Sequence, residues 1–183
     1  MKSILKNIVA FSVISFSINT AAQEKQPMLG QQAPSFSLNA VDGKIYSLEQ
    51  SRGKYVVIHF AATWCPFCNA EAPYLQELYK NYRNKGVDVF IVDVKEEKAL
   101  VEKSFARFNF SFPVLLDEDG AVSARYAPEG VQPDLARHEV PLASNLIIDK
   151  EGKIRFYSLL NSTAFDAKLT KLKEILDALL NSK

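Results

Sequence analysis

The order of apolar and amphipathic stretches predicts that strands and helices alternate in the middle of the chain. Residues 55–61 and 87–94 are almost continuously apolar and rich in β-branched and aromatic side chains, which is typical of strands covered on both faces. Between them, over residues 66–86, apolar residues recur at intervals of three and four, which predicts an amphipathic helix. A helix over 96–108 and a short strand over 112–116 are expected to follow. This order favours parallel strands with helices on both faces of the sheet.

A hairpin is predicted before this core. Residues 33–38 and 44–48 show strand-like patterns, and the turn residues Asp42 and Gly43 lie between them. We therefore expect a short antiparallel pair at the beginning of the domain.

The C-terminal part is predicted to add a second antiparallel pair and a helix. Residues 142–149 and 154–160 are apolar and are joined by a short polar turn, so they should pair antiparallel. A last stretch carries apolar residues at helical spacing, namely Phe165, Leu169, Leu172, Leu176 and Leu179. We interpret residues 161–163, which match a glycosylation acceptor, as the cap of this helix. Residues 128–139 lack periodicity and predict an exposed loop.

The composition is that of one globular domain. The chain has 183 residues, of which 48% are hydrophobic, and its formal net charge is +1 with acids and bases interspersed. This length suits one well-packed domain and is short for two. Because no basic block is present, a nucleic-acid partner is not expected. We therefore expect a monomer with one domain over residues 33–183, preceded by a polar linker over 23–32.

Residues 1–22 differ from the rest of the chain. Lys2 and Lys6 precede an apolar run over 8–18, and small residues at 20–22 offer a cleavage site. This pattern is typical of a secretory signal peptide. An uncleaved anchor is the alternative, although the run is roughly half of the ~20 residues that span a bilayer. Export predicts a periplasmic or otherwise extracytoplasmic protein, in a compartment where disulfides persist.

The chain has two cysteines, Cys65 and Cys68, at the point where the strand over 55–61 gives way to a helix. A helix start exposes unpaired N–H groups and a partial positive charge, so Cys65 is the predicted thiolate. Pro66 suits the first helical position, and Cys68 then falls on the same turn, close enough to form a disulfide with Cys65. We interpret the pair as a redox-active dithiol.

Two other uses of the same spacing stay open. The pair could be half of a zinc site, for which His59 and His138 would have to supply ligands from distant segments. It could also be an inert structural disulfide, although so short a loop constrains the unfolded chain little. We expect neither a metal nor another cofactor.

The chain resembles the TlpA/ResA-like thiol-disulfide oxidoreductases, which are exported members of the thioredoxin superfamily. The similarity spans residues 30–180 and rests on four motifs: Gly30-x-x-Ala33-Pro34-x-Phe36, Ala62-Thr63-Trp64-Cys65, Glu71-x-Pro73 and Phe112-Pro113-Val114-Leu115-Leu116-Asp117. It implies an α/β, thioredoxin-like fold: a mixed central sheet flanked by helices, with an N-terminal hairpin and a central insertion that holds the last motif.

The resemblance also implies roles for residues around the dithiol. Cys65 would attack and Cys68 would resolve. Pro141, preceded by Val140, would be a cis-proline that faces the disulfide; an ordinary trans proline at a strand entry is the alternative. Trp64 would form an apolar platform beside the dithiol, unless it packs in the core.

Three features depart from the family pattern: a dipeptide between the cysteines, a histidine in the strand before them, and the loop over 128–139, which has no counterpart in the family. The Pro66-Phe67 dipeptide is closer to that of glutaredoxins, and His59 stands where thioredoxin keeps a buried acid. His59 is then either a hydrogen-bonded core histidine or a group coupled to the dithiol. Glu71, one turn beyond Cys68, becomes the expected nearby carboxylate, which would oppose thiolate formation and relay the proton of the resolving cysteine. Its alternative is a solvated helix carboxylate.

The resemblance implies that the protein reduces disulfides in exported proteins such as apocytochrome c, with electrons from a membrane thiol donor. The dipeptide favours a higher potential, but Glu71 and the family favour a reductant with a potential below about −200 mV. The alternatives are a disulfide oxidant, a peroxiredoxin and a copper-handling protein that uses two thiolates and a histidine such as His138. In peroxiredoxins a threonine precedes the nucleophile by three positions, where this chain has Ala62.

Overall fold

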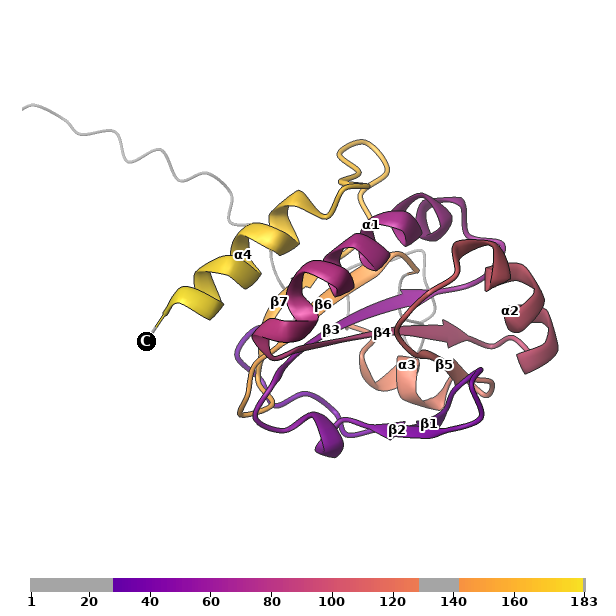
Figure 1. The fold of residues 1–183 in the computed structure, drawn as a ribbon, viewed down its shortest axis with the longest axis horizontal. Helices are drawn as coiled ribbons and strands as arrows, with labels where there is room; N and C mark the ends of the chain where they lie inside the picture. The colour runs from indigo at the N-terminus through magenta and orange to yellow at the C-terminus, as the bar shows by residue number, and fades with distance from the viewer. Residues whose placement is uncertain (1–27, 129–141, 183) are drawn as a thin grey trace, which may run out of the picture.

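The computed structural model describes residues 28–128 and 142–182. In these residues the chain forms a five-stranded sheet with the strand order β5-β4-β3-β6-β7 (Figure 1). The strand bounds are β3 Tyr55–Ala61, β4 Val87–Val94, β5 Val114–Asp117, β6 Ser144–Ile148 and β7 Ile154–Ser158. β3, β4 and β5 pair in parallel, whereas β6 is antiparallel to both β3 and β7. The predicted thioredoxin-like fold with a mixed sheet is confirmed.

The hairpin precedes the sheet as predicted, with shorter strands. β1 (Ser37–Asn39) and β2 (Ile45–Ser47) pair antiparallel. In the turn, Gly43 has a φ of 79°, and the Lys44 N–H donates to Asp42 Oδ1 at 3.0 Å. A positive φ is costly for most side chains, so the glycine is what lets the chain reverse here.

Helices cover both faces of the sheet, which confirms the predicted layers. α1 (Pro66–Tyr82), α2 (Lys98–Phe105) and α4 (Thr170–Asn181) share one cluster of buried side chains on one face. α3 (Ala121–Arg125) and the hairpin share a second cluster on the other face, and Figure 1 shows this arrangement with α1 and α4 on one side of the strands and α3 on the other. The short 3-10 helices are η1 Glu49–Ser51, η2 Arg83–Lys85 and η3 Ala106–Phe108.

The central strand β3 positions the site. All seven of its residues are buried, and it pairs with β4 on one side and β6 on the other. Alternate side chains therefore point into the two clusters: Val57 packs on the side of α1, whereas Ile58 packs on the side of α3. The carboxyl end of β3 leads directly to the first turn of α1.

The start of the C-terminal helix was predicted wrongly. α4 begins at Thr170, with Leu169 as its N-cap, and not near residue 165. Asn161 does not cap it: its Oδ1 accepts the N–H groups of Thr163 and Ala164 and closes a separate turn. The acid at the helix start is Asp166, whose Oδ2 accepts the Lys171 N–H at 2.9 Å.

Several predicted features lie outside the described residues. These are the signal peptide over 1–22, most of the loop over 128–139, and both Val140 and Pro141. Within the predicted linker over 23–32, the Gly30 N–H donates to the carbonyl of Ile154 and the carbonyl of Gln31 accepts from its N–H, so this end of the linker is tied to β7. Of the helices in the part of the chain that the structure describes, none is both long and apolar enough to cross a membrane.

Candidate active site

The predicted dithiol lies where β3 ends and α1 begins. Cys65 is the N-cap residue of α1, and Pro66 is the first residue of the helix. Cys65 and Cys68 form a disulfide, with 5.3 Å between their Cα atoms, and each residue is only 3% exposed. The structure therefore joins the two residues that the spacing paired.

The backbone at the helix start favours a thiolate on Cys65. The Cys68 N–H lies 3.2 Å from Cys65 Sγ, and the first turn of α1 contains no acidic residue. In the reduced protein this N–H and the positive end of the helix dipole would both stabilise negative charge on Cys65. The sulfur of Cys68 instead lies 3.9 Å from the carbonyl oxygen of Phe60, a partner that cannot stabilise an anion.

Two aromatic residues flank the disulfide in different ways. Trp64 is 70% exposed, so it does not pack in the core. Phe67 is half-buried, and its ring meets that of Phe165 edge to face, with 4.9 Å between the centroids. Trp64 is thus available to a partner, whereas Phe67 ties the active-site turn to the segment before α4.

Glu71 is a buried carboxyl and not a solvated one. It is 3% exposed, and its two oxygens lie 3.2 and 3.3 Å from the Asn145 side-chain amide nitrogen. Its Oε2 also lies 3.2 Å from Nδ1 of His59, which in turn lies 2.9 Å from Asn145 Oδ1. The structure therefore brings together Glu71 from α1, His59 from β3 and Asn145 from β6, one helical turn below Cys68.

The charge state of this trio follows from its burial. Burial raises the pKa of Glu71 to about 8, although the Asn145 amide opposes the shift. Burial lowers the pKa of His59 to about 4, again against the effect of Asn145. Near neutral pH the histidine is therefore uncharged and Glu71 is mostly protonated. Because an amide oxygen only accepts, Nδ1 of His59 carries the hydrogen, and Nε2 has no partner in the described part of the protein.

Asn145 was missed by the sequence analysis. It lies 86 positions from His59 and 74 from Glu71 along the chain, so no local motif connects them. The available signal was its polarity within the apolar stretch 142–149. Buried polar groups are normally hydrogen-bonded, so such a residue requires a partner across the sheet.

A second polar network holds the loop before Cys65. The carboxylate of Glu96, which follows β4, accepts both the N–H and the hydroxyl of Thr63, the latter at 2.7 Å. Asn69 on α1 donates to the Thr63 carbonyl at 3.0 Å and accepts from Arg107 at 3.0 Å. Thr63 is thus held on both its N–H and its carbonyl side. None of these contacts was predicted from the sequence.

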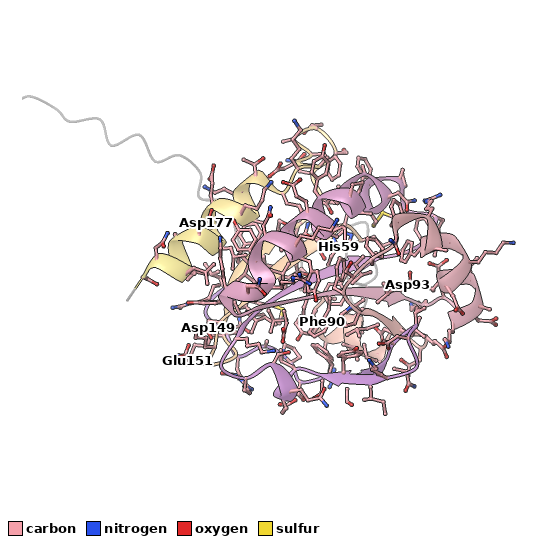
Figure 2. The ribbon with its side chains drawn as sticks, in the orientation of Figure 1. His59, Phe90, Asp93, Asp149, Glu151 and Asp177 are labelled. Atoms are coloured by element: carbon pink, nitrogen blue, oxygen red, sulfur yellow. A yellow bond between two sulfur atoms is a disulfide. The ribbon has the colours of Figure 1, made fainter. Side chains whose placement is uncertain are left out.

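Asp93 is a further buried acid near this loop. It is fully buried on β4, in register with Ala61, and neither of its carboxyl oxygens accepts a hydrogen bond from a donor among the described residues. Burial, next the negative charge of Glu96, and then a hydrogen bond between the protonated Asp93 carboxyl and the Glu96 side chain raise the pKa of Asp93 to about 8. Figure 2 labels Asp93 and His59, with His59 close to α1 and Asp93 toward α2. The signal in the sequence was an acid within the apolar stretch 87–94.

The segment that enters β6 lies beside the disulfide. Ala143 is buried in the same cluster as both cysteines, and its N–H donates to the Phe60 carbonyl at 2.9 Å. Its φ of 58° is in the left-handed region, which is unfavourable for a non-glycine residue. Pro141, predicted to face the disulfide, lies two positions earlier and outside the described residues.

A cavity reaches Glu71 from the side of α4. Its volume is about 260 Å³, and its wall includes Glu71, Ala143 and Asn145 together with Asp166 and Phe165. The negative charge of Asp166 adds to the rise in the pKa of Glu71. The carboxyl next to the dithiol therefore has an opening of its own.

In the ranges 28–128 and 142–182, no group of three or more histidine, cysteine, aspartate or glutamate side chains is placed to hold a metal ion. His138, the histidine suggested as a copper ligand, lies outside these ranges.

The chain is similar to known proteins both in sequence and in fold. The model of the AhpC/TSA family matches residues 29–157. The thiol-disulfide oxidoreductase ResA of Bacillus cereus is 32% identical over 160 residues, which are 81% of this chain and 86% of that protein. ResA of Geobacillus thermodenitrificans is 38% identical over 127 residues, 69% of this chain and 67% of that protein.

Among solved structures, a thiol:disulfide interchange protein of the thioredoxin family from Chlorobium tepidum has a TM-score of 0.66 to this chain. The two are 22% identical, and the match covers 85% of this chain and 98% of that chain. At this identity the likeness supports the fold.

Proposed function

The chain belongs to the ResA-like thiol-disulfide oxidoreductases of the AhpC/TSA family, and from this premise we propose that it reduces disulfides of proteins outside the cytoplasm. The oxidoreductase activity follows from these relatives and from the Cys65–Cys68 pair. The observation that supports the reducing direction is the buried carboxyl of Glu71, one turn below Cys68. Once ionised, as the pH rises toward about 8, Glu71 puts a negative charge beside the dithiol and raises the thiol pKa, whereas strong oxidants depend on a very stable thiolate.

The proposed reaction has two exchange steps. First, the thiolate of Cys65 attacks one sulfur of the partner's disulfide, the partner's S–S bond breaks, and the released partner thiolate takes a proton from water. Next, Cys68 loses its proton and attacks Cys65 Sγ. This breaks the mixed disulfide, releases the second partner thiol and leaves the Cys65–Cys68 disulfide, so two electrons have passed to the partner.

Glu71 is the proposed proton acceptor for Cys68. The pKa of Glu71 is raised to about 8, close to the ordinary value of a thiol, so a proton can move between the two groups at little cost in free energy. The hydrogen bonds from Asn145 hold the carboxyl in both protonation states. The cavity on the side of α4 would let Glu71 exchange this proton with water while a partner covers the dithiol.

The proposed docking surface surrounds the helix start. Trp64 projects from the surface next to Cys65 and would contact the partner through its exposed ring. Pro141, preceded by Val140, is the proposed second contact with a partner; the described residue Ala143, which follows them in the sequence, packs with both cysteines.

The proposed compartment and electron source follow from the N-terminal residues. Residues 1–22 have the pattern of a signal peptide, and an exported dithiol would be held oxidised by its surroundings unless it received electrons. A membrane thiol donor is therefore a proposed partner. Exported proteins with reducible cysteines, such as apocytochrome c during cytochrome c maturation, are the proposed substrates, and the protein would act as a monomer.

Trapping tests the proposal. The variant Cys68→Ser cannot resolve a mixed disulfide, so it should accumulate covalent complexes through Cys65 in cells. Cys65→Ser is the matched control and should form none. Exported cysteine-containing proteins among the trapped species would support the proposal; complexes on Cys65→Ser but not on Cys68→Ser would reverse the roles of the two cysteines.

A further inference from the structure

The carboxylate of Glu96 holds the loop before Cys65, which comprises residues 62–64. Glu96 accepts both the N–H and the hydroxyl of Thr63, two positions before Cys65. The Cys65 N–H in turn donates to the carbonyl of Ala62 at 3.1 Å, so the turn from Ala62 to Cys65 is continuous with this anchor. A charged acceptor with two donors is a strong contact. If Glu96 released Thr63, the geometry of the nucleophile would change.

Asp93 lies next to Glu96, and no hydrogen-bond donor among the described residues would stabilise its carboxylate form. It is fully buried, it faces Ala61 across the strand pair, and no donor among the described residues reaches either oxygen; in its protonated form the carboxyl hydrogen-bonds to the Glu96 side chain. A buried carboxylate without donors is costly, whereas a protonated carboxyl is tolerated. Asp93 takes no part in the proposed thiol exchange. A buried acid that stays protonated in the folded protein therefore calls for a separate explanation.

We infer that Asp93 is a positioning residue of the dithiol: in its protonated form it allows Glu96 to hold Thr63, and its ionisation releases the loop. The inference rests on the proposed role of Cys65 as the attacking thiol. An ionised Asp93 would put a second negative charge beside Glu96. Because Glu96 is only half-buried, the easiest relief is for its side chain to turn toward water and leave Thr63.

Of the charged side chains on the neighbouring elements, Glu96 is the one whose negative charge opposes the ionisation of Asp93. Neighbouring positions on β3 and β5 are Ala61 and Leu116, which carry no charge. On α1, Glu71 is bound to Asn145, and on η3, Arg107 donates to Asn69. The charged side chains of α2 are exposed: Lys98, Glu102 and Lys103. Consistent with this, the pKa of Asp93 is raised first by burial and next by Glu96.

The chain offers a built-in reporter for the loop. Trp64 is its only tryptophan, it is exposed, and it lies between Thr63 and Cys65. In the oxidised protein the two cysteines cannot titrate, so a change in tryptophan emission with pH reports the loop and not the thiols. This separates the present inference from the proposed reaction, because the titration needs no thiol exchange.

The experiment is a pH titration of Trp64 emission in the oxidised full chain, between about pH 6 and 10. We expect a transition near pH 8 in the wild-type protein, because that is the range in which Asp93 ionises. Asp93→Asn, which mimics the protonated form, should abolish the transition. Glu71→Gln should retain it, and so should Asp88→Asn, a control on the same strand whose carboxylate pairs with Lys54 at 3.1 Å.

The reduced protein provides the functional readout. After correction for the thiolate fraction, the rate of disulfide reduction at pH 9 should fall up to about tenfold in the wild type, since only about one tenth of a group with a pKa near 8 is then protonated. Asp93→Asn should not show this fall. If Asp93→Asn does not fold, Glu96→Gln serves instead, because removing the second charge should also abolish the emission transition. A wild-type protein without a transition, or a transition that persists in the folded variant, overturns the inference.

Discussion

Glu71 and Asp93 are two buried carboxyls on the same side of the central sheet, and their surroundings differ. Glu71 has hydrogen bonds from Asn145 and a histidine 3.2 Å away, whereas no donor among the described residues reaches Asp93, whose protonated carboxyl hydrogen-bonds to Glu96. Burial nevertheless raises the pKa of each to about 8. The two groups therefore have a similar pKa for different reasons. Their hydrogen-bond partners and their access to water, rather than the pKa, indicate what each group can do.

The difference separates proton exchange from positioning. Glu71 keeps its donors in either protonation state, and a cavity opens to it, so it can lose and regain a proton without disturbing its neighbours. Asp93 gains no donor when it ionises, so its charge must be relieved by movement of the chain around it. We therefore assign proton exchange to Glu71 and positioning of the active-site loop to Asp93.

The largest expected effect is on stability at Asp93. Its carboxyl has a pKa of about 8 in the folded protein against an ordinary value of 3.8, so the contribution of Asp93 to stability is greatest below about pH 4 and is lost as pH rises toward 8. At about 1.4 kcal/mol for each pKa unit, the loss is on the order of several kcal/mol. Asp93→Asn should remove this decline, as measured by urea unfolding at a series of pH values. Parallel curves for the two proteins would show that Asp93 is not a strained acid.

The next effect concerns catalysis at Glu71. Glu71→Gln should lower the thiol pKa values and slow disulfide exchange near neutral pH by about tenfold or more, because it removes a carboxyl that becomes charged in the pH range where thiols titrate and that accepts the Cys68 proton. Thiolate absorbance and stopped-flow reduction of a protein disulfide measure the two quantities. Glu77→Gln, on the exposed side of the same helix, is the matched control. Thiol titrations and rates identical to those of the wild type would exclude Glu71 from the reaction.

The smallest effect is expected at His59. Its Nδ1 lies 3.2 Å from the Glu71 carboxyl, so His59→Asn should shift the pH dependence of disulfide reduction, by less than about one pH unit because the ring is uncharged near neutral pH. The variant should also be less sensitive to acid. The pKa of His59 is about 4 in the folded protein, below its ordinary value of 6.5. The contribution of His59 to the stability of the wild type is therefore lost as pH falls from about 6.5 to about 4. Superimposable rate profiles would leave His59 a purely structural role.

Local patterns were enough to predict the sheet, the hairpin, the dithiol and the proximity of Glu71. The strand over 55–61 and the cysteine spacing depend on neighbouring residues, and Glu71 follows from one helical turn. Asn145, Glu96 and Asp93 were missed because their contacts join segments far apart in the sequence. Each interrupts or follows an apolar strand, but polarity alone does not identify the partner.

The error at the C-terminal helix also has a physical cause. Phe165 and Leu169 continue the apolar spacing of α4, but Phe165 packs on Phe67 and Leu169 adopts a left-handed backbone conformation, with a φ of 55°. A turn closed by Asn161 precedes them. The apolar pattern therefore runs through a turn before the helix begins.

Equilibration of the Cys65–Cys68 pair against glutathione shows whether this protein donates electrons to its partners or accepts them. The ratio of dithiol to disulfide at each glutathione potential gives the midpoint potential at pH 7. We predict a value below about −200 mV, in the range of reducing members of the thioredoxin superfamily. A value near the ~−120 mV of the strong periplasmic oxidant would contradict the account and make the protein a disulfide donor.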